Sequence, residues 1–146
     1  MINLDIEKLT AIFRDHGLKL TIQRLAIFNS IISRKDHPST EQVYESLKEK
    51  YPTISLATIY KTLHIFNELG LIQELNFSDG NIRYDPNMEL HVNIVCIKCG
   101  EIIDYSNKKV KDLWQPIISD LNFKPKGQRI DIYYECETCK NLNTKK

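Results

Sequence analysis

All four cysteines of the 146-residue chain occur in two Cys-x-x-Cys pairs. The first pair is Cys96 and Cys99, and the second is Cys136 and Cys139. Two such pairs can place four thiolates around one ion, and Zn2+ suits a closed all-sulfur site because it is redox-inert and imposes no geometry of its own. The spacing therefore predicts a structural zinc site that joins the two ends of the segment between the pairs.

Other chemistries are open to cysteines in this pattern. One pair could form a redox dithiol of the thioredoxin type, each pair could close a local disulfide, or iron could replace zinc. A redox motif needs only one pair, placed at the N-terminus of a helix, and neither pair is expected at such a position. Structural zinc is therefore the favoured interpretation.

The first half of the chain has the pattern of four helices followed by a hairpin. Helical spacing of apolar residues covers residues 4–16 and 22–32, with Thr21 as the cap of the second stretch. Ser39 and Gln42 form a capping box that opens a third helix, and Ser55 caps a fourth. Strand-like runs at residues 71–77 and 81–85 flank the turn signal Ser78-Asp79-Gly80. This order of elements is that of a winged helix-turn-helix.

A polar, turn-forming segment at residues 85–89 (DPNME) separates this half from the next. Beyond it we expect strands at residues 91–96, 101–104 and 129–134, a helix at 110–121, and a frayed tail at 141–146. The predicted fold class is α+β. A winged-helix domain occupies residues 1–84, a hinge residues 85–90, and a small, zinc-stapled α/β domain residues 91–146.

The composition excludes several classes of protein. Lys and Arg number 20 against 19 Asp and Glu, so the chain as a whole lacks the basic excess usual in nucleic-acid binding. With 42% hydrophobic residues and only 5 Gly and 5 Pro, disorder is not its main state. No apolar run approaches the roughly 20 residues of a membrane span, and Asp5 and Glu7 stand where an export signal would be positively charged. We therefore expect a cytoplasmic protein with no membrane partner.

Several motifs together resemble the ferric uptake regulator (Fur) family, most closely its peroxide-sensing PerR branch. They are residues 17–24 (GLKLTIQR), His37-Pro38, residues 55–61 (SLATIYK), residues 68–71 (ELGL), and His91 in register with the cysteine pairs. The similarity covers nearly the whole chain. It implies a homodimeric, metal-activated transcription repressor, whose winged helix binds double-stranded promoter DNA and whose C-terminal domain dimerises.

The resemblance also implies a second, regulatory site for Fe2+ or Mn2+ at the hinge. The matching positions here are His37, Asp85, His91, Asn93 and Asp104. Two imidazoles and two carboxylates form a mixed nitrogen and oxygen set that suits these ions. The chain departs from the motif at Asn93, where a second His is expected, and an amide oxygen is a weaker ligand. Asp104 stands where iron sensors often have Glu, which favours the PerR branch.

A helix that reads the major groove needs short polar side chains and a few cations to reach bases and phosphates. The helix after Ser55 offers such residues on its predicted solvent side, although any one of them could belong to an ordinary solvated face. Lys19 and Arg24 precede the second helix and are expected to contact phosphates. The DNA-binding residues predicted in this way are Lys19, Arg24, Ser55, Thr58, Tyr60 and Lys61, with Thr62 beside them.

The favoured function is therefore a metal-dependent, DNA-binding transcription repressor that responds to peroxide or to Fe or Mn levels. An iron-uptake-type regulator without peroxide sensing is the first alternative. A zinc-bound thiol oxidoreductase and a zinc-bound interaction adaptor are alternatives of other classes. An enzyme is not expected, because four cysteines close the zinc site and the sequence contains no nucleophile-plus-base pattern or glycine-rich phosphate loop.

Overall fold

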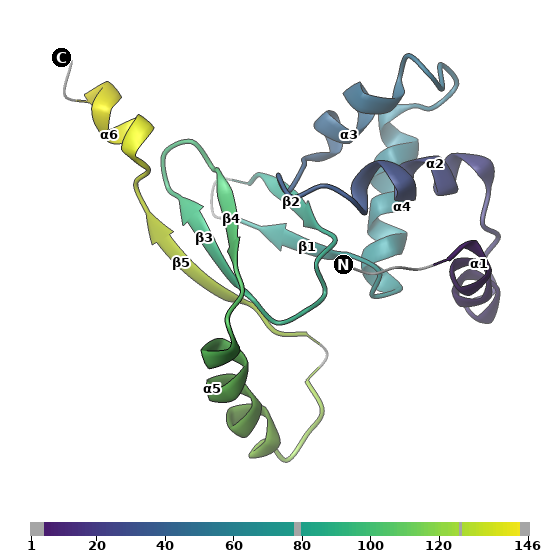
Figure 1. Ribbon diagram of the computed structural model, residues 1–146. Helices are drawn as coiled ribbons and strands as arrows, with labels where there is room; N and C mark the ends of the chain where they lie inside the picture. Colours follow the sequence, from purple (N-terminus) through teal and green to yellow (C-terminus); the bar gives the residue numbers. More distant parts are fainter. Residues whose placement is uncertain (1–4, 78–79, 126, 144–146) are drawn as a thin grey trace. The chain divides into compact units, whose positions relative to one another are not determined.

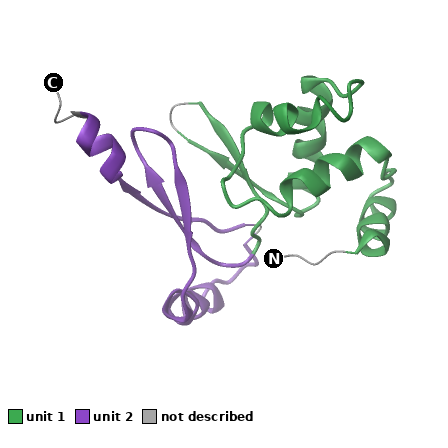
Figure 2. Cartoon of the chain, turned by 45° about the horizontal axis from the view of Figure 1, so that its top comes forward, with its two compact units in different colours: residues 1–88 green, residues 89–146 purple. Residues whose placement is uncertain are grey.

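The computed structural model describes residues 5–77, 80–125 and 127–143. The chain divides into two compact units, unit 1 (Met1–Met88) and unit 2 (Glu89–Lys146), which are coloured separately in Figure 2. The boundary between the two units lies within the polar segment at residues 85–89. Over the ranges just given, no helix is both long and apolar enough to cross a membrane.

Over its described residues, unit 1 contains four helices and a two-stranded hairpin (Figure 1). Three of the helix starts follow the predicted caps, because Thr21, Ser39 and Ser55 each accept a hydrogen bond from a backbone N–H of the first turn. Asp5 caps the first helix in the same way. In chain order the elements are α1 (Ile6–Asp15), α2 (Ile22–Ile31), α3 (Thr40–Leu47), α4 (Leu56–Glu68), β1 (Gln73–Asn76) and β2 (Ile82–Asp85).

The core of unit 1 holds α4 against the other helices. The ring of Phe66 on α4 makes edge-to-face contacts with Phe13 on α1, at 6.1 Å between centroids, and with Phe28 on α2, at 5.7 Å. Such pairs contribute about 0.5–1.5 kcal/mol each beyond their burial. Thr62, predicted on the solvent side of α4, is instead 3% exposed. It lies three residues after the fully buried Ile59, and therefore on the same face of the helix.

The hairpin of unit 1 pairs β1 with β2 in antiparallel register, from Gln73 opposite Asp85 to Asn76 opposite Ile82. The first strand begins later than predicted, because Leu71 and Ile72 are buried in the core before the ladder starts. Of the predicted turn, Ser78 and Asp79 lie outside the described residues. The element order is that expected of a winged helix.

Unit 2 is built on a three-stranded sheet in the order β4-β3-β5. The central strand β3 (Val92–Cys96) is antiparallel to β4 (Ile102–Tyr105) and parallel to β5 (Ile130–Tyr134). Parallel neighbours require a crossover, and α5 (Lys108–Ser119) lies within this connection. This helix starts two residues before the predicted position because the Asn107 side chain accepts from the backbone N–H of Lys109.

The strand register places an apolar and a polar row of side chains on opposite faces of this sheet. One cross-strand row contains Ile103, Ile94 and Ile132, and the adjacent row contains Asp104, Asn93 and Asp131. Because side chains alternate along a strand, the two rows point to opposite faces. Ile103 and Ile132 are 46% and 53% exposed. One face thus presents accessible apolar side chains, and the other carries polar groups.

The end of unit 2 departs from the prediction. A helix, α6 (Glu137–Asn143), includes residues 141–143, which were predicted to be frayed, whereas residues 144–146 lie outside the described part. It begins directly after Cys136, and the backbone N–H of Lys140 donates to the carbonyl of Cys136. The prediction that neither cysteine pair lies at a helix N-terminus is therefore wrong for the second pair. Seven residues are too few for hydrophobic periodicity to reveal a helix.

Candidate metal centres and nucleic-acid interface

The four cysteines converge in unit 2. Cys96 ends β3, Cys99 follows in the turn before β4, and the second pair opens α6. Their sulfur atoms all lie within 4.8 Å of one another, and the Cys99 and Cys136 sulfurs are 3.8 Å apart. Four sulfurs at about 2.3 Å from a tetrahedral zinc are about 3.8 Å from one another. The residues present therefore fit one closed zinc site.

The backbone favours the thiolate form that a metal needs. Hydrogen bonds from the backbone N–H groups of Cys136 and Cys99 lower the pKa of Cys96 to about 6. The Cys136 donor lies 3.4 Å from the Cys96 sulfur. In contrast, the neighbouring Cys136 sulfur raises the pKa of Cys139. Sulfurs this close cannot all be anionic without a cation among them, which again favours a bound metal.

The geometry also bears on the other cysteine chemistries. All four cysteines are free, so the two local disulfides are not formed. The second pair does lie at a helix start, as a redox dithiol would, yet its sulfurs share one cluster with the first pair. A redox dithiol needs only its own two sulfurs and does not require the first pair nearby. A four-thiolate metal site requires all four sulfurs to converge.

Unit 1 contributes a buried pair, His37 and Asp85, each 1% exposed. The His37 Nε2 lies 3.7 Å from the Asp85 Oδ2. The backbone N–H of Tyr84 donates to the carbonyl of Pro38, which fixes the loop beside β2. The backbone N–H of Asn87 donates to the Asp85 Oδ1, at 2.7 Å, so that the carboxylate has a defined orientation.

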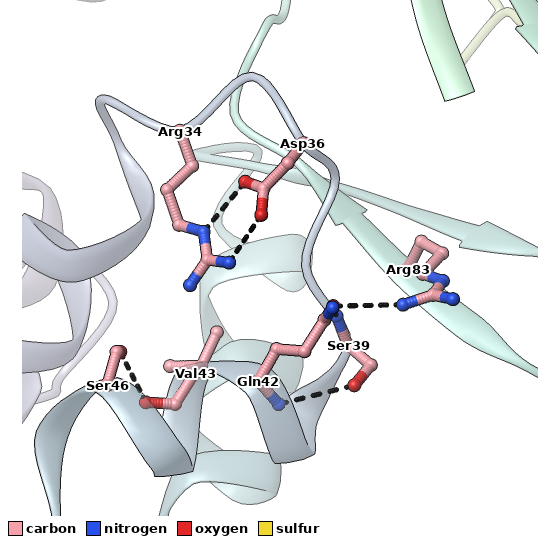
Figure 3. Close-up of polar contacts among 7 residues, drawn as sticks. All are labelled: Arg34, Asp36, Ser39, Gln42, Val43, Ser46 and Arg83. Carbon is pink, nitrogen blue, oxygen red and sulfur yellow. Dashed lines mark hydrogen bonds and ion pairs between the residues drawn. The ribbon is translucent and has the colours of Figure 1, made fainter. Parts of the chain in front are cut away.

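The segment around His37 is fixed on both sides (Figure 3). Before it, the Arg34 guanidinium makes two hydrogen bonds to the Asp36 carboxylate. After it, Ser39 and Gln42 form the predicted capping box of α3, and Arg83 on β2 donates to the Gln42 side chain at 2.9 Å. These contacts join the loop, α3 and β2 into one local framework.

His37 has an unusual backbone conformation. Among the residues that the structure describes, it is the only non-glycine residue with a positive φ, at 46°. Such a conformation costs on the order of 1–3 kcal/mol in a non-glycine residue and persists where the surroundings impose it. Its occurrence at a buried His beside an Asp marks this position as a functional candidate.

Unit 2 brings together three of the predicted regulatory ligands. His91 and Asn93 are 5% and 2% exposed and lie two residues apart, on one face of the chain at β3. The His91 Nε2 lies 3.2 Å from the Asn93 Oδ1 and 3.6 Å from the Asp104 Oδ1. On the other side of the ring, Nδ1 lies 2.7 Å from the carbonyl oxygen of Glu89. One imidazole and two oxygen-bearing side chains therefore form half of a mixed metal site.

Asp131, which the sequence analysis did not single out, joins this group from β5. Its Oδ1 accepts from Asn93, at 3.1 Å, and from the Arg129 Nε, at 2.8 Å. Its Oδ2 contacts the Arg129 Nη2, at 2.7 Å, and accepts from the Tyr133 hydroxyl, at 3.1 Å. Burial acts to raise the pKa of Asp131, but hydrogen bonds from Arg129 and Asn93 outweigh it and lower the pKa below its ordinary value. The carboxylate is therefore ionised near neutral pH.

The candidate DNA-reading residues on α4 differ in exposure. Tyr60 is 53% exposed and Lys61 is exposed, so both can reach a ligand. The Ser55 hydroxyl caps the helix by accepting from the backbone N–H of Thr58 and also pairs with the Thr58 hydroxyl. Ser55 and Thr58 therefore have a structural role at the helix start, although Ser55 is exposed as well. Tyr60 and Lys61 are the exposed candidates beyond the cap.

Lys19 and Arg24, the predicted phosphate contacts, also differ in their exposure to solvent. Lys19 is exposed. Arg24 is half-buried, with its guanidinium 5.6 Å from the centre of the Phe13 ring and one Nη donating to the backbone carbonyl of Lys19. These contacts hold the start of α2 on α1, and the remaining guanidinium hydrogens are left for a phosphate.

Comparison with known proteins identifies the family. The model of the ferric uptake regulator family matches residues 15–133. The chain belongs to the ferric uptake regulator family. The matched region contains every predicted regulatory ligand and every predicted DNA-binding residue, but it ends before Cys136. The argument for the second cysteine pair therefore rests on the geometry of this chain.

Individual members of the ferric uptake regulator family resemble the chain over most of its length. The peroxide-responsive repressor PerR of Staphylococcus epidermidis is 35% identical over 139 residues, which are 95% of this chain and 93% of the relative. The solved PerR of Streptococcus pyogenes is 31% identical, with a TM-score of 0.53 and coverage of 93% and 94%. The Pseudomonas aeruginosa ferric uptake regulator, solved with manganese, is 27% identical, with a TM-score of 0.73 and coverage of 87% and 96%.

These similarities confirm the predicted fold class, an N-terminal winged helix followed by a small C-terminal α/β domain, as in the ferric uptake regulator family. A family of regulators also fits the expectation that the chain is not an enzyme. This chain has Asn93 where the family motif has a second His. The structure places Asn93 in one group with His91 and Asp104.

Proposed function

We propose that this member of the ferric uptake regulator family is a repressor that senses peroxide through a regulatory Fe2+ site. As a family member the chain is a metal-dependent, DNA-binding transcription repressor. The observation that carries the proposal is a His beside an Asp in each unit. His37 and Asp85 form a buried pair, and the buried His91 lies beside the partly exposed Asp104. The relation to peroxide-responsive repressors supports peroxide as the signal.

The regulatory ion takes ligands from both units in this proposal. Unit 1 supplies His37 and Asp85, and unit 2 supplies His91, Asn93 and Asp104. Two imidazoles with carboxylate and amide oxygens suit Fe2+ or Mn2+. Only residues 86–90 separate Asp85 from His91 in the sequence. An ion that binds both halves favours one relative arrangement of the units, and so raises the affinity for DNA if that arrangement is the one that binds.

The other parts of the molecule have distinct roles in the proposal. Zinc at the four cysteines is structural, and double-stranded promoter DNA binds to unit 1 through Tyr60 and Lys61 of α4 with Lys19 and Arg24 as phosphate contacts. Unit 2 forms a homodimer. The apolar row that includes Ile103 and Ile132, together with exposed Leu113 on α5, supports a protein partner for unit 2. The proposed location is the cytoplasm, because a repressor acts where promoter DNA lies.

Peroxide sensing predicts a covalent product. When Fe2+-loaded protein is treated with hydrogen peroxide, one oxygen atom is added to an imidazole carbon of His37 or His91, and the other leaves as water. The two-electron oxidation of the imidazole balances the reduction of the peroxide. We expect peptides that contain either His to gain one oxygen, and DNA binding to be lost. Peptide mass spectrometry and a gel shift on the same samples measure both.

Mn2+-loaded protein serves as the control, because Mn2+ is expected to support DNA binding without oxidation of the ligands. His16, exposed directly after α1, serves as an internal control within the same digest. An Fe2+ sample that keeps both histidines unmodified and still binds DNA after peroxide would leave a plain iron- or manganese-responsive repressor of the iron-uptake type.

The DNA-binding assignment predicts different effects for two neighbours on α4. Lys61→Ala should weaken DNA binding about tenfold at low salt and reduce the salt slope by about one, because it removes one phosphate contact. Tyr60→Ala should reduce the preference for operator over random DNA, because an aromatic side chain packs against bases. Both variants should keep wild-type metal content. Fluorescence anisotropy at two salt concentrations measures these effects.

Lys124→Ala in unit 2 is the matched control for loss of one positive charge, and it should bind DNA like the wild type. If both α4 variants bound operator DNA with unchanged affinity and salt dependence, α4 would not be the reading helix.

A further inference from the structure

The orientation of the Asn93 amide decides whether this residue helps or opposes metal binding. An asparagine presents a carbonyl oxygen on one side and an NH2 group on the other. The oxygen can bind a cation, whereas the NH2 group repels it. Asn93 lies between Asp104 and Asp131 in the polar row of the sheet, so each side of the amide has a defined neighbour.

The neighbour on the β5 side can only accept hydrogen bonds. Arg129 binds both oxygens of the Asp131 carboxylate, and the Tyr133 hydroxyl donates to Oδ2. These contacts fix the carboxylate plane, with Oδ1 placed 3.1 Å from the Asn93 Nδ2. Both Asp131 oxygens already receive donors from Arg129, so the carboxylate is placed to accept from Asn93, and the NH2 group of Asn93 must face it. The carbonyl oxygen then faces the other side.

The His91 ring is likewise oriented by a partner that can only accept a hydrogen bond. The Glu89 carbonyl oxygen can only accept, so the His91 Nδ1, at 2.7 Å from it, carries the hydrogen. In the neutral ring Nε2 then has an electron pair, which faces the Asn93 Oδ1 at 3.2 Å and the Asp104 Oδ1 at 3.6 Å. Three electron-pair donors therefore converge, an arrangement that a cation stabilises.

We propose that Asp131, held by Arg129 and Tyr133, is a positioning residue that locks Asn93 as a carbonyl-oxygen ligand of the regulatory metal. The inference rests on the proposed regulatory site and specifies how this chain supports it without a second histidine. An oriented oxygen in place of an imidazole shifts the ligand set towards ions that prefer oxygen, such as Mn2+. If Asp131 is replaced by a side chain that can also donate, the Asn93 amide is able to turn and present its NH2 group to the cation.

A double-mutant cycle tests whether Asp131 acts through Asn93. In zinc-loaded protein, Asp131→Asn should weaken Mn2+ binding about tenfold, in the range of outer ligand partners at metal sites. In an Asn93→Ala background, the same substitution should change Mn2+ affinity less than about twofold, because no amide remains to be oriented. Titration of free Mn2+ by its electron paramagnetic resonance signal gives the affinities, with Mn2+ alone as the probe.

Two controls separate positioning from folding. Tyr133→Phe removes only the hydrogen bond to the Asp131 Oδ2, leaves the Arg129 contacts, and should change Mn2+ affinity less than Asp131→Asn does. Zinc content and thermal unfolding should remain near wild type in every variant of the cycle. A loss of Mn2+ affinity that is the same in the wild-type and Asn93→Ala backgrounds would show a general structural effect and overturn the proposal.

A measurement on the wild-type protein decides the orientation even if Asp131→Asn fails to fold. Asn93 and the Arg129 Nε donate to the same oxygen, so their hydrogens must lie close together. We expect a nuclear Overhauser effect between the Asn93 NH2 and the Arg129 Nε hydrogen, with Asn93→Ala used for assignment. A contact from this NH2 to the His91 ring instead would overturn the inference. Absence of any Mn2+ binding by wild-type protein would reject the proposed regulatory site, which is a separate result.

Discussion

Replacing Cys96 or Cys136 by Ser is expected to release the zinc and to unfold unit 2. These two cysteines come from the two different pairs and lie at the ends of the segment between them. The binding free energy of a four-cysteine zinc site, on the order of 10 kcal/mol, is comparable to the whole stability of a small domain and contributes directly to its folding. We expect less than one zinc per chain and a loss of near-ultraviolet circular dichroism from Trp114, which lies in unit 2.

Thr138→Ala is the matched control, because Thr138 lies between the cysteines of the second pair and is exposed. It should retain full zinc and wild-type thermal unfolding. Treatment of the wild type with a strong chelator should reproduce the serine variants. A Cys96→Ser protein with one zinc per chain and unchanged unfolding would refute the four-cysteine site.

The helices of unit 1 were predictable because their start signals are local. Ser39 and Gln42 form the capping box that their three-residue spacing predicts. Thr62 shows the limit of this approach. A threonine between buried positions of a helix can lie on either edge of the apolar face, and packing against the other helices decides which.

The proposed metal ligands within each unit were easier to single out than their surroundings. A pair of cysteines marks Cys96 as a candidate ligand by residue type, and the resemblance to the family marks His91 as another. Asp131 could not be singled out in this way, because it meets Asn93 only through a parallel pairing of β3 with β5, across the crossover that contains α5. No pattern in the sequence specifies that register. The sequence shows only that Asp131 is an acidic residue within a predicted strand, which does not indicate a contact with Asn93.

The backbone at His37 was likewise beyond prediction. A residue before a proline is expected in an extended conformation, because the proline ring crowds the helical region. His37 instead has a φ of 46°, imposed by the Arg34–Asp36 pair before it and the α3 cap after it. This conformation depends on contacts that the complete unit provides, so that only the structure could show it.

His37→Ala is expected to abolish the activation of DNA binding by Fe2+ or Mn2+. The substitution removes the imidazole that unit 1 contributes and leaves Asp85 as its only proposed ligand. A metal can shift the equilibrium between two arrangements of the units only by its difference in affinity for them. Loss of the unit 1 imidazole reduces that difference. We expect the increase in operator affinity on adding Mn2+ to fall at least tenfold, which corresponds to about 1.4 kcal/mol.

The same variant should leave three other properties near wild type, namely zinc content, the oligomeric state and metal-free operator affinity, because the cysteine site and α4 are untouched. His16→Ala is the control, since this exposed histidine follows α1 and its ring contacts the carbonyl of Ile12 on that helix. Operator affinity with and without Mn2+, measured at one salt concentration, gives the coupling for each variant. Full activation of His37→Ala by Mn2+ would exclude His37 from the regulatory site and leave Asp85 as the one ligand through which unit 1 could take part.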